Sequence, residues 1–374
     1  MTNTLSDTTR ALIARCIRPD VQAMQAYVVQ DAAGMVKLDA MENPHRLPLY
    51  LQALLGQRLG ALALNRYPDG RTHDLRRALA TYASLPEGCD LMLGNGSDEL
   101  ISLLTLACAA PPSAANGFKP ASVLAPVPGF VMYAMSAQLQ GLAFHGVPLT
   151  ADFELDEAAM LAAIAEHQPT ITYLAYPNNP TANLWDDAAI EAIVQAVGAQ
   201  GGLVVMDEAY QPFSSKSYID RLARHPHVLL MRTLSKFGLA GVRLGYMMGA
   251  KALIDQIDKV RPPYNISSLN CECALFALEH HAVFAAQAAD LRAQREMLLA
   301  ALAGLPGVKA YPSDANMVLV RVPDALKTFD GMRARQVLIK NVSKMHPLLA
   351  NCLRLTVGTS DENQRMLTAL RESL

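Results

Sequence analysis

The sequence predicts an α/β protein with a large domain, whose mostly parallel central sheet is flanked by helices, and a smaller α+β domain. Its 374 residues are 51% hydrophobic and 18% charged, a composition typical of chains that bury a substantial core. From about residue 72 to residue 262, strand-like apolar runs alternate with helical segments, which is the order of a parallel sheet covered by helices. After residue 262 the pattern changes to a long helical stretch followed by strands.

The first part of the chain predicts a short helix and an irregular arm, because Pro44 and Pro48 interrupt any helix between them. Residues 73–85 are amphipathic and predict a helix. Residues 90–110 predict a short strand, a glycine turn and a helix. Residues 121–130 and 170–180 predict strands that end in proline-rich turns.

The alternation continues toward the middle of the chain. Residues 185–202 predict a helix closed by glycines, and residues 203–210 and 227–236 predict strands. Residues 267–304 have a helical pattern interrupted only at His280 and His281, and strands are predicted within 308–322 and 353–359. We therefore expect an arm over 1–45 that joins the small domain, a large domain over 46–262 and a small domain over 263–374.

Charge and cysteine usage argue against several classes of protein. The net charge near −2 offers no electrostatic attraction for nucleic acid or an anionic membrane. The first residues lack the apolar core of a signal peptide. None of the six cysteines forms a Cys-x-x-Cys pair, and Cys271 and Cys273 would face different sides of a helix, so no metal site is expected. We expect a soluble cytoplasmic protein with reduced thiols.

Polar side chains follow three of the predicted strands. Asn179 follows the strand in 170–180, Asp207 follows 203–206, and Lys236 ends the segment 227–236. In open parallel sheets, ligands bind beyond the carboxyl ends of the strands, so these side chains are expected to face one crevice. A lysine, an acid and an amide in one crevice match the needs of pyridoxal phosphate.

Lys236 lies in RTLSKFGLAGVRLGY, residues 232–246, where its neighbours are mostly apolar. A buried amine loses hydration and its pKa falls, which suits it to form a Schiff base with an aldehyde. Asp207 would keep the pyridine nitrogen protonated, and Tyr210 or Asn179 could hydrogen-bond the phenolic oxygen of the ring. Each residue alone has a structural alternative: a helix-start acid, a turn asparagine or a solvated lysine.

A cradle for a phosphate group is predicted in GNGSDEL, residues 94–100. Gly94 and Gly96 allow close approach of the backbone to an anion, and the following helix would direct free N–H groups at it. Ser97 is also a plausible helix N-cap, which is the structural alternative. Thr233, Ser235 and Arg243 lie near the lysine in sequence and could add hydroxyl groups and a guanidinium.

Seven motifs together resemble the fold-type-I pyridoxal-phosphate aminotransferases, and within them the branch that acts on histidinol phosphate. They are MENP, YPDG, GNGSDEL, YPNNPT, MDEAY, RTLSKFGLAGVRLGY and CLRLTVGT, in order from about residue 40 to residue 359. The resemblance therefore covers most of the chain. It implies the fold of this family and pyridoxal 5'-phosphate as the cofactor.

The resemblance also implies a role for each matching residue. Lys236 would form the covalent link to the cofactor, Asp207 would pair with its ring nitrogen, and Asn179 and Tyr210 would bind its phenolic oxygen. Ser97 and Asp98 would bind the phosphate through backbone N–H groups, beside Ser235 and Arg243. Tyr67 would reach the phosphate bound in the neighbouring subunit of a homodimer. Arg354 would bind an anionic group of the substrate, and Asn43 in MENP is a further expected substrate contact.

Three positions depart from the pattern of the family. Phe130 stands where a tyrosine usually stacks on the ring, so the hydroxyl group is lost. Ala182 stands where glycine is usual, and we expect the turn there to differ slightly rather than to strain an alanine at positive φ. Lys340 lies near a usual substrate-binding arginine and keeps the charge without the bidentate geometry.

The reaction implied is the transfer of an amino group between L-histidinol phosphate and 2-oxoglutarate, giving imidazole-acetol phosphate and L-glutamate in histidine biosynthesis. Lys236 would remove and return the proton in two half-reactions. Three alternatives remain open: an aromatic amino-acid aminotransferase, a decarboxylase of a phosphorylated amino acid, and a cofactor-binding regulator. The regulator would need a DNA-binding segment, and residues 1–45 show no basic helix-turn-helix pattern.

Overall fold

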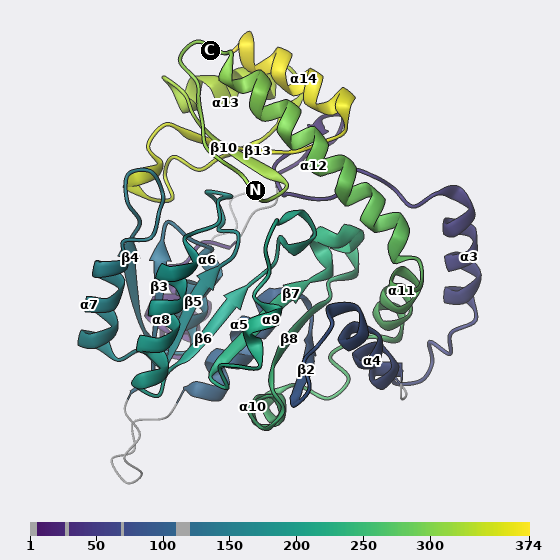
Figure 1. Ribbon diagram of the computed structural model, residues 1–374, viewed down its shortest axis with the longest axis vertical. Coiled ribbons are helices and arrows are strands. Elements are labelled where there is room, and N and C mark those ends of the chain that lie inside the picture. The colour runs from purple at the N-terminus through teal and green to yellow at the C-terminus, as the bar shows by residue number, and fades with distance from the viewer. Residues whose placement is uncertain (1–5, 27–29, 69–70, 110–119) are drawn as a thin grey trace. The chain divides into compact units, whose positions relative to one another are not determined.

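The computed structural model describes residues 6–26, 30–68, 71–109 and 120–374 (Figure 1). The chain divides into two compact units, Met1–Gly34 and Met35–Leu374. The first unit contains the helices α1 (Asp7–Cys16) and α2 (Pro19–Gln22). Ser6 caps α1, since its side chain accepts a hydrogen bond from the backbone N–H of Thr9.

The larger sheet of the second unit has, within the described residues, seven strands in the order β2-β8-β7-β6-β5-β3-β4. Strand β8 runs antiparallel to both β2 and β7, and the remaining pairs are parallel. The prediction of a mostly parallel central sheet is therefore confirmed. The strands are β2 (Cys89–Gly94), β3 (Ser122–Val127), β4 (Ala143–Pro148), β5 (Ile171–Ala175), β6 (Leu203–Asp207), β7 (Val228–Thr233) and β8 (Gly245–Ala250).

Helices cover both faces of this sheet, because successive strand side chains point to opposite faces and both sets are apolar. On β2, for example, Leu91 and Leu93 enter one core while Met92 enters the other. The first core includes side chains of α4 (Arg71–Ala83), α7 (Glu157–His167), α8 (Asp187–Ala199), α9 (Ile219–Leu222) and α11 (Ser268–Glu279). The second includes side chains of α5 (Gly96–Cys108), α6 (Val131–Leu139) and α10 (Lys251–Ile257).

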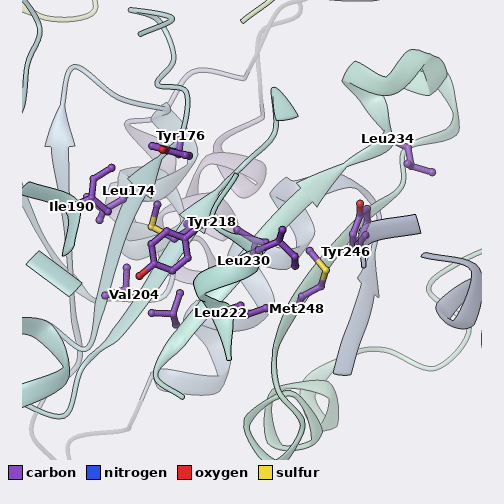
Figure 2. Close-up of a cluster of buried hydrophobic side chains, with 14 of the residues drawn as sticks. Leu174, Tyr176, Ile190, Val204, Tyr218, Leu222, Leu230, Leu234, Tyr246 and Met248 are labelled. Atoms are coloured by element: carbon purple, nitrogen blue, oxygen red, sulfur yellow. The ribbon is translucent and has the colours of Figure 1, made fainter. Parts of the chain in front are cut away.

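Figure 2 shows part of the first core, where side chains from neighbouring strands meet those of α8 and α9. Leu174, Val204 and Leu230 come from three adjacent parallel strands, and each is fully buried. Such continuous apolar strands are typical of parallel sheets covered on both sides. The carboxyl ends of these strands are thereby held in one row.

The smaller sheet has the order β12-β13-β10-β9 and is antiparallel, and strands β1 and β11 form a separate parallel pair. These strands are β1 (Val36–Lys37), β9 (Lys309–Ala310), β10 (Met317–Arg321), β11 (Val337–Leu338), β12 (Lys340–Asn341) and β13 (Cys352–Thr356). The remaining helices are α3 (Leu49–Gly60), α12 (His281–Ala303), α13 (Ala325–Ala334) and α14 (Ser360–Arg371), with short helices η1 (Gln211–Phe213), η3 (Ala240–Val242), η4 (Asp258–Val260) and η5 (Pro347–Leu349).

Sheet membership changes near residue 262. The strands of the larger sheet all precede it, whereas β9 to β13 follow it, and β1 of the arm pairs with β11. On this basis we propose a large domain over 46–262 and a small domain over 263–374, with the arm over 1–45 contributing β1. The helical stretch predicted for 267–304 is confirmed as α11 and α12, which are separated at His280.

A buried ion pair joins the ends of β6 and β7. The side chains of Glu208 and Arg232 are 0% and 7% exposed. Arg232 Nε donates to Glu208 Oε2 at 2.9 Å, and Arg232 Nη2 donates to the hydroxyl of Ser217 at 2.9 Å. The backbone N–H of Tyr218 donates to the other oxygen of Glu208. Because Glu208 directly follows Asp207, this pair fixes the strand end that carries Asp207.

Candidate active site

A cavity of about 400 Å³ opens at the carboxyl ends of β5, β6 and β7. Segments from widely separated parts of the second unit line it, as expected at this edge of an open parallel sheet. The lining residues are Ala40, Met41, Glu42, Ser97, Asp98, Phe130, Tyr133, Ala175, Pro177, Asn179, Asp207, Ala209, Tyr210, Thr233, Ser235, Lys236, Ala240, Gly241 and Arg243. Asn179, Asp207 and Lys236 are thus brought together, as the sequence predicted.

Lys236 lies just beyond β7, in the π-helical turn η2 (Ser235–Leu239). Its Nζ donates to the backbone carbonyl of Ala40 at 3.0 Å and lies 5.9 Å from the centre of the Tyr210 ring. Burial, and then the charge of Arg354, lower the pKa of Lys236 to about 8. The amine is therefore easier to deprotonate than an ordinary lysine.

The turn that holds Lys236 requires glycine at position 238. Gly238 has φ of +136°, and a Cβ there would lie 2.8 Å from the ring of Phe284. A side chain would therefore be strained by both backbone conformation and contact. This requirement explains the glycine two residues after the lysine.

Asp207 is the last residue of β6 and is 4% exposed. Its Oδ2 accepts a hydrogen bond from the hydroxyl of Tyr133 at 2.6 Å, and its Oδ1 accepts one from the backbone N–H of Ala209 at 3.0 Å. Burial raises the pKa of Asp207 to about 6, although these two donors oppose the shift. A buried carboxylate thus lines the cavity.

Arg354 and Asn179 meet beside the cavity. Arg354 lies on β13, and its Nη1 donates to Oδ1 of Asn179 at 2.7 Å. Its Nη2 donates to the backbone carbonyl of Asp39 at 2.8 Å. The guanidinium is therefore fixed from two sides, and Asn179 is held by a residue that was predicted to bind substrate.

The start of α5 forms one end of the cavity. Asn95 is the N-cap and makes no side-chain capping bond, so Ser97 is not the N-cap and that alternative is wrong. The first backbone N–H groups of a helix have no partner within it, so those of Gly96, Ser97 and Asp98 are available to an anion. Ser97 and Asp98 line the cavity beside Thr233.

Arg243 completes this end of the cavity. Its Nη1 lies 3.4 Å from the hydroxyl of Ser235, and its Nη2 donates to Oδ2 of Asp98 at 3.2 Å. Gly96 has φ of +79°, and a Cβ at Gly96 would lie 2.8 Å from Nη2 of Arg243. The absence of a side chain at Gly96 therefore leaves room for the guanidinium against the helix start.

Phe130 and Tyr210 also line the cavity, which is where both were expected. The ring of Phe130 packs edge-on against Tyr133, with ring centres 5.6 Å apart. Tyr133 is the residue that the sequence reasoning missed. It follows Phe130 by three residues, so the helical spacing of α6 was the signal that could have found it.

Four predicted residues do not line this cavity: Arg354, which lies beside it, and Tyr67, Asn43 and Lys340. Tyr67 is 78% exposed, and its ring stacks on Tyr264 with centres 4.7 Å apart. Asn43 donates from Nδ2 to Gln287 on α12 at 2.9 Å. Lys340 lies on β12, directly across the strand pair from Arg354. The motif around Tyr67 continues into residues 69 and 70, which lie outside the described residues.

The turn after β5 keeps a left-handed backbone. Ala182 has φ of +68° and is fully buried. The expectation that this turn would differ to avoid positive φ is therefore wrong. The turn is fixed by hydrogen bonds from the Ala182 N–H to the carbonyl of Asn178 and from the Asp314 N–H to the carbonyl of Ala182, which hold the alanine in a conformation that usually favours glycine.

Over residues 6–26, 30–68, 71–109 and 120–374, no cluster of three or more His, Cys, Asp and Glu side chains is arranged to hold a metal ion. In that same part of the chain, no helix is long and apolar enough to cross a membrane.

Comparison with known proteins agrees with this geometry. Residues 36–370 match the family described as aminotransferase class I and II. Histidinol-phosphate aminotransferase of Polaromonas naphthalenivorans (strain CJ2) is 75% identical over 362 residues, which cover 97% of each chain. The protein of the same name from Methylibium petroleiphilum is 70% identical over 96% of this chain and 95% of its own.

Among solved structures, histidinol-phosphate aminotransferase from Sinorhizobium meliloti in complex with pyridoxal-5'-phosphate has a TM-score of 0.79 at 23% identity. The match covers 96% of this chain and 97% of that one, and at this identity it shows the fold alone. The family match extends over nearly the whole second unit, and the curated relatives match it over almost their full length. The chain therefore belongs to the aminotransferase class I and II family.

Proposed function

We propose that this aminotransferase transfers an amino group between L-histidinol phosphate and 2-oxoglutarate, with imidazole-acetol phosphate and L-glutamate as the products, in histidine biosynthesis. The observation that carries the proposal is the single cavity into which three adjacent strand ends bring Lys236, Asp207 and Asn179. The substrate is supported by the names of relatives at 65–75% identity over almost the whole chain.

Pyridoxal 5'-phosphate is the proposed cofactor, and the residues present fit it. A buried carboxylate at Asp207 can hold a protonated ring nitrogen, and the open N-terminus of α5 with Arg243 and Ser235 can bind the phosphate. The cavity of about 400 Å³ lies within the usual range for small-molecule sites. When bound, this cofactor supplies an aldehyde that condenses with amines and a ring that accepts electrons from the substrate.

Lys236 is proposed as the group that moves the proton. With a pKa of about 8, roughly a tenth of its amine is uncharged at pH 7, which is far more than for an ordinary lysine. Its Nζ can accept the proton from the α-carbon of the amino donor and, in the reverse direction, can donate a proton to the α-carbon of the keto acid that is aminated. Asp207 holds the ring-nitrogen proton in place, while Asn179 and Tyr210 orient the ring through its phenolic oxygen.

Substrate binding is assigned to the cationic groups near β13. Arg354 is pre-oriented by Asn179 and the carbonyl of Asp39, and can bind either a carboxylate or a phosphate. Lys340, opposite Arg354 in the sheet, would add a second positive charge. Phe130 would stack on the ring face. Asn43 would contact substrate only by exchanging its present hydrogen bond with Gln287.

Gly96 at the proposed phosphate cradle should be needed for tight binding of the cofactor. Gly96→Ala should weaken the binding of pyridoxal phosphate by at least about tenfold, because the new methyl group meets Arg243 and displaces it from the helix start. Gly88→Ala is the matched control, since Gly88 has φ of +80° but no atom within 4 Å of a new Cβ. Fluorescence titration of both apo variants with the cofactor measures the difference in affinity. Equal affinities of the two variants would show that the phosphate group does not bind at Gly96.

We also propose that the enzyme acts as a homodimer. The described chain exposes large apolar side chains on α3, on the loop after it and near the start of α11, and α3 packs against α11. They are Leu49, Tyr50, Leu54, Leu64, Tyr67, Tyr264 and Leu269. A second copy of the chain would cover this surface, and Tyr67 would then reach the phosphate in the partner's site.

Mixed dimers test the position of Tyr67. In a dimer of one Lys236→Ala subunit and one Tyr67→Ala subunit, one site keeps Lys236 and receives the intact Tyr67 from the other subunit. Co-expression with two affinity tags should therefore restore up to about half of wild-type activity, although each variant alone is weak. Mixed dimers no more active than the two variants alone would show that Tyr67 does not act across the interface.

The substrate proposal is tested by following the visible absorption band of the bound cofactor. Glutamate should bleach the band, and imidazole-acetol phosphate should then restore it, as two half-reactions require. If only aromatic keto acids restore the absorption band, the substrate is an aromatic amino acid and not histidinol phosphate. Release of carbon dioxide from a phosphorylated amino acid would replace the reaction by decarboxylation.

We also propose that the protein is cytoplasmic. The proposed reaction uses small metabolites of central amino-acid biosynthesis, and all six cysteines are free thiols. No partner other than the second copy and the small-molecule substrates is proposed.

A further inference from the structure

Tyr133 is a buried residue that lines the candidate active site. It is 2% exposed, and its ring stacks on Tyr173 with centres 4.2 Å apart and an interplanar angle of 7°. Phe130 also packs against the Tyr133 ring, with the two rings nearly perpendicular at 85°. Because the ring is held by two aromatic neighbours, its hydroxyl group has a fixed position.

That hydroxyl donates to Oδ2 of Asp207 at 2.6 Å, while the Ala209 N–H binds Oδ1. Each carboxylate oxygen therefore has a donor, and the plane of the carboxylate is set before any cofactor binds. Burial, and then the charge of Asp207, raise the pKa of Tyr133 well above its ordinary value. The phenol thus keeps its proton and remains the donor.

Opposing interactions set the charge state of Asp207. Burial and the neighbouring charges of Asp98 and Glu208 favour its neutral form, whereas Tyr133 and the Ala209 N–H favour the carboxylate. A neutral acid cannot hold a proton on a ring nitrogen by charge. The titratable groups that act on Asp207 or lie around it come from four elements and are Asp98 on α5, Tyr133 on α6, Tyr173 on β5, and Glu208 and Tyr210 after β6.

We propose that Tyr133 is a positioning residue that keeps Asp207 an oriented carboxylate, and so allows Asp207 to hold the proton on the ring nitrogen of the cofactor. Tyr133 acts through Asp207 and takes no part in the transfer of the substrate proton. The inference rests on the proposed cofactor but not on the identity of the substrate.

The test is the affinity of apo variants for pyridoxal phosphate between about pH 5 and pH 9. Tyr133→Phe removes only the hydroxyl, so the pKa of Asp207 should rise above about 6 and binding should fall off at a higher pH than in wild type. At pH 7 the affinity should drop by roughly two- to tenfold, because the loss of one hydrogen bond to a charged group leaves a larger fraction of Asp207 protonated.

Tyr173→Phe is the matched control, because it removes a hydroxyl from the other ring of the same stack, and that hydroxyl makes no hydrogen bond to Asp207. It should keep the wild-type pH profile. The 1-deaza analogue of the cofactor, which carries a C–H group in place of the ring nitrogen, should bind wild type and Tyr133→Phe equally.

Three results would overturn the inference: a Tyr133→Phe profile that overlays wild type, equal losses in both variants at every pH, or a loss that persists with the deaza analogue. The second of these would assign Tyr133 to packing alone. Failure of wild type to bind pyridoxal phosphate would instead overturn the proposed function itself, so the two failures are distinguishable.

Discussion

Replacing Lys236 by alanine is expected to reduce transamination by at least about 10⁴-fold, the upper end of what one positioned acid–base group contributes. The reason is that no other amine lines the described cavity to form the covalent link or to move the proton. Pyridoxal phosphate should still bind noncovalently, because Asp207, the start of α5 and Arg243 remain. Steady-state turnover and cofactor content of the purified variant measure the two effects separately.

Lys344→Ala is the control for this variant, since Lys344 is an exposed lysine of the same chain. It should retain wild-type turnover and cofactor content. Wild-type turnover in the Lys236→Ala protein would show that the base lies elsewhere.

Replacing Arg232 by methionine is expected to lower the free energy of unfolding by about 3–5 kcal/mol, the usual result of breaking a buried ion pair. The change leaves the carboxylate of Glu208, which is fully buried, without its positive partner. Because Glu208 follows Asp207 directly, cofactor affinity should fall as well. The urea midpoint of the apo protein, followed by circular dichroism, reports the loss of stability.

The double variant Arg232→Met, Glu208→Gln separates charge from packing. Glutamine is neutral and its oxygen can still accept from the Tyr218 N–H and the hydroxyl of Ser217, so most of the lost stability should return. If the single variant is as stable as the double, the uncompensated charge of Glu208 is not the cause.

The sequence was a good guide to the strand ends and their chemistry. The parallel strands β5, β6 and β7 consist mostly of apolar residues, so their ends could be located to within a few residues. Because parallel strands place their carboxyl ends on one edge, Asn179, Asp207 and Lys236 could be assigned to one crevice without knowledge of the loops.

Strand β8 could not be predicted in the same way. Its sequence, GYMMGA, is short and carries two glycines, which usually indicate a turn. The structure shows why position 245 is a glycine: a Cβ there would lie 2.8 Å from the backbone carbon of Gly96 and 2.9 Å from the N–H nitrogen of Ser97. The glycine lets β8 approach the start of α5, which is a tertiary requirement that no local pattern reveals.

The features of the site that the sequence did not predict depend on contacts between distant segments of the chain. Lys236 donates to a carbonyl almost two hundred positions earlier, and Arg354 donates to Asp39 and Asn179. Asn43 instead binds Gln287, because the arm passes α12 at that point. Ala182 keeps the positive φ that its position requires, since hydrogen bonds on both sides fix the turn. Spacing along the chain does not determine any of these arrangements.

Reduction of the cofactor-loaded protein with borohydride, followed by digestion and mass spectrometry, shows whether Lys236 is covalently linked to the cofactor. We expect the peptide containing Lys236 to carry the mass of the reduced pyridoxyl phosphate group, because this amine lines the proposed cofactor site and has a pKa of about 8. An unmodified Lys236 peptide, or the same mass on a different lysine such as Lys340, would contradict it.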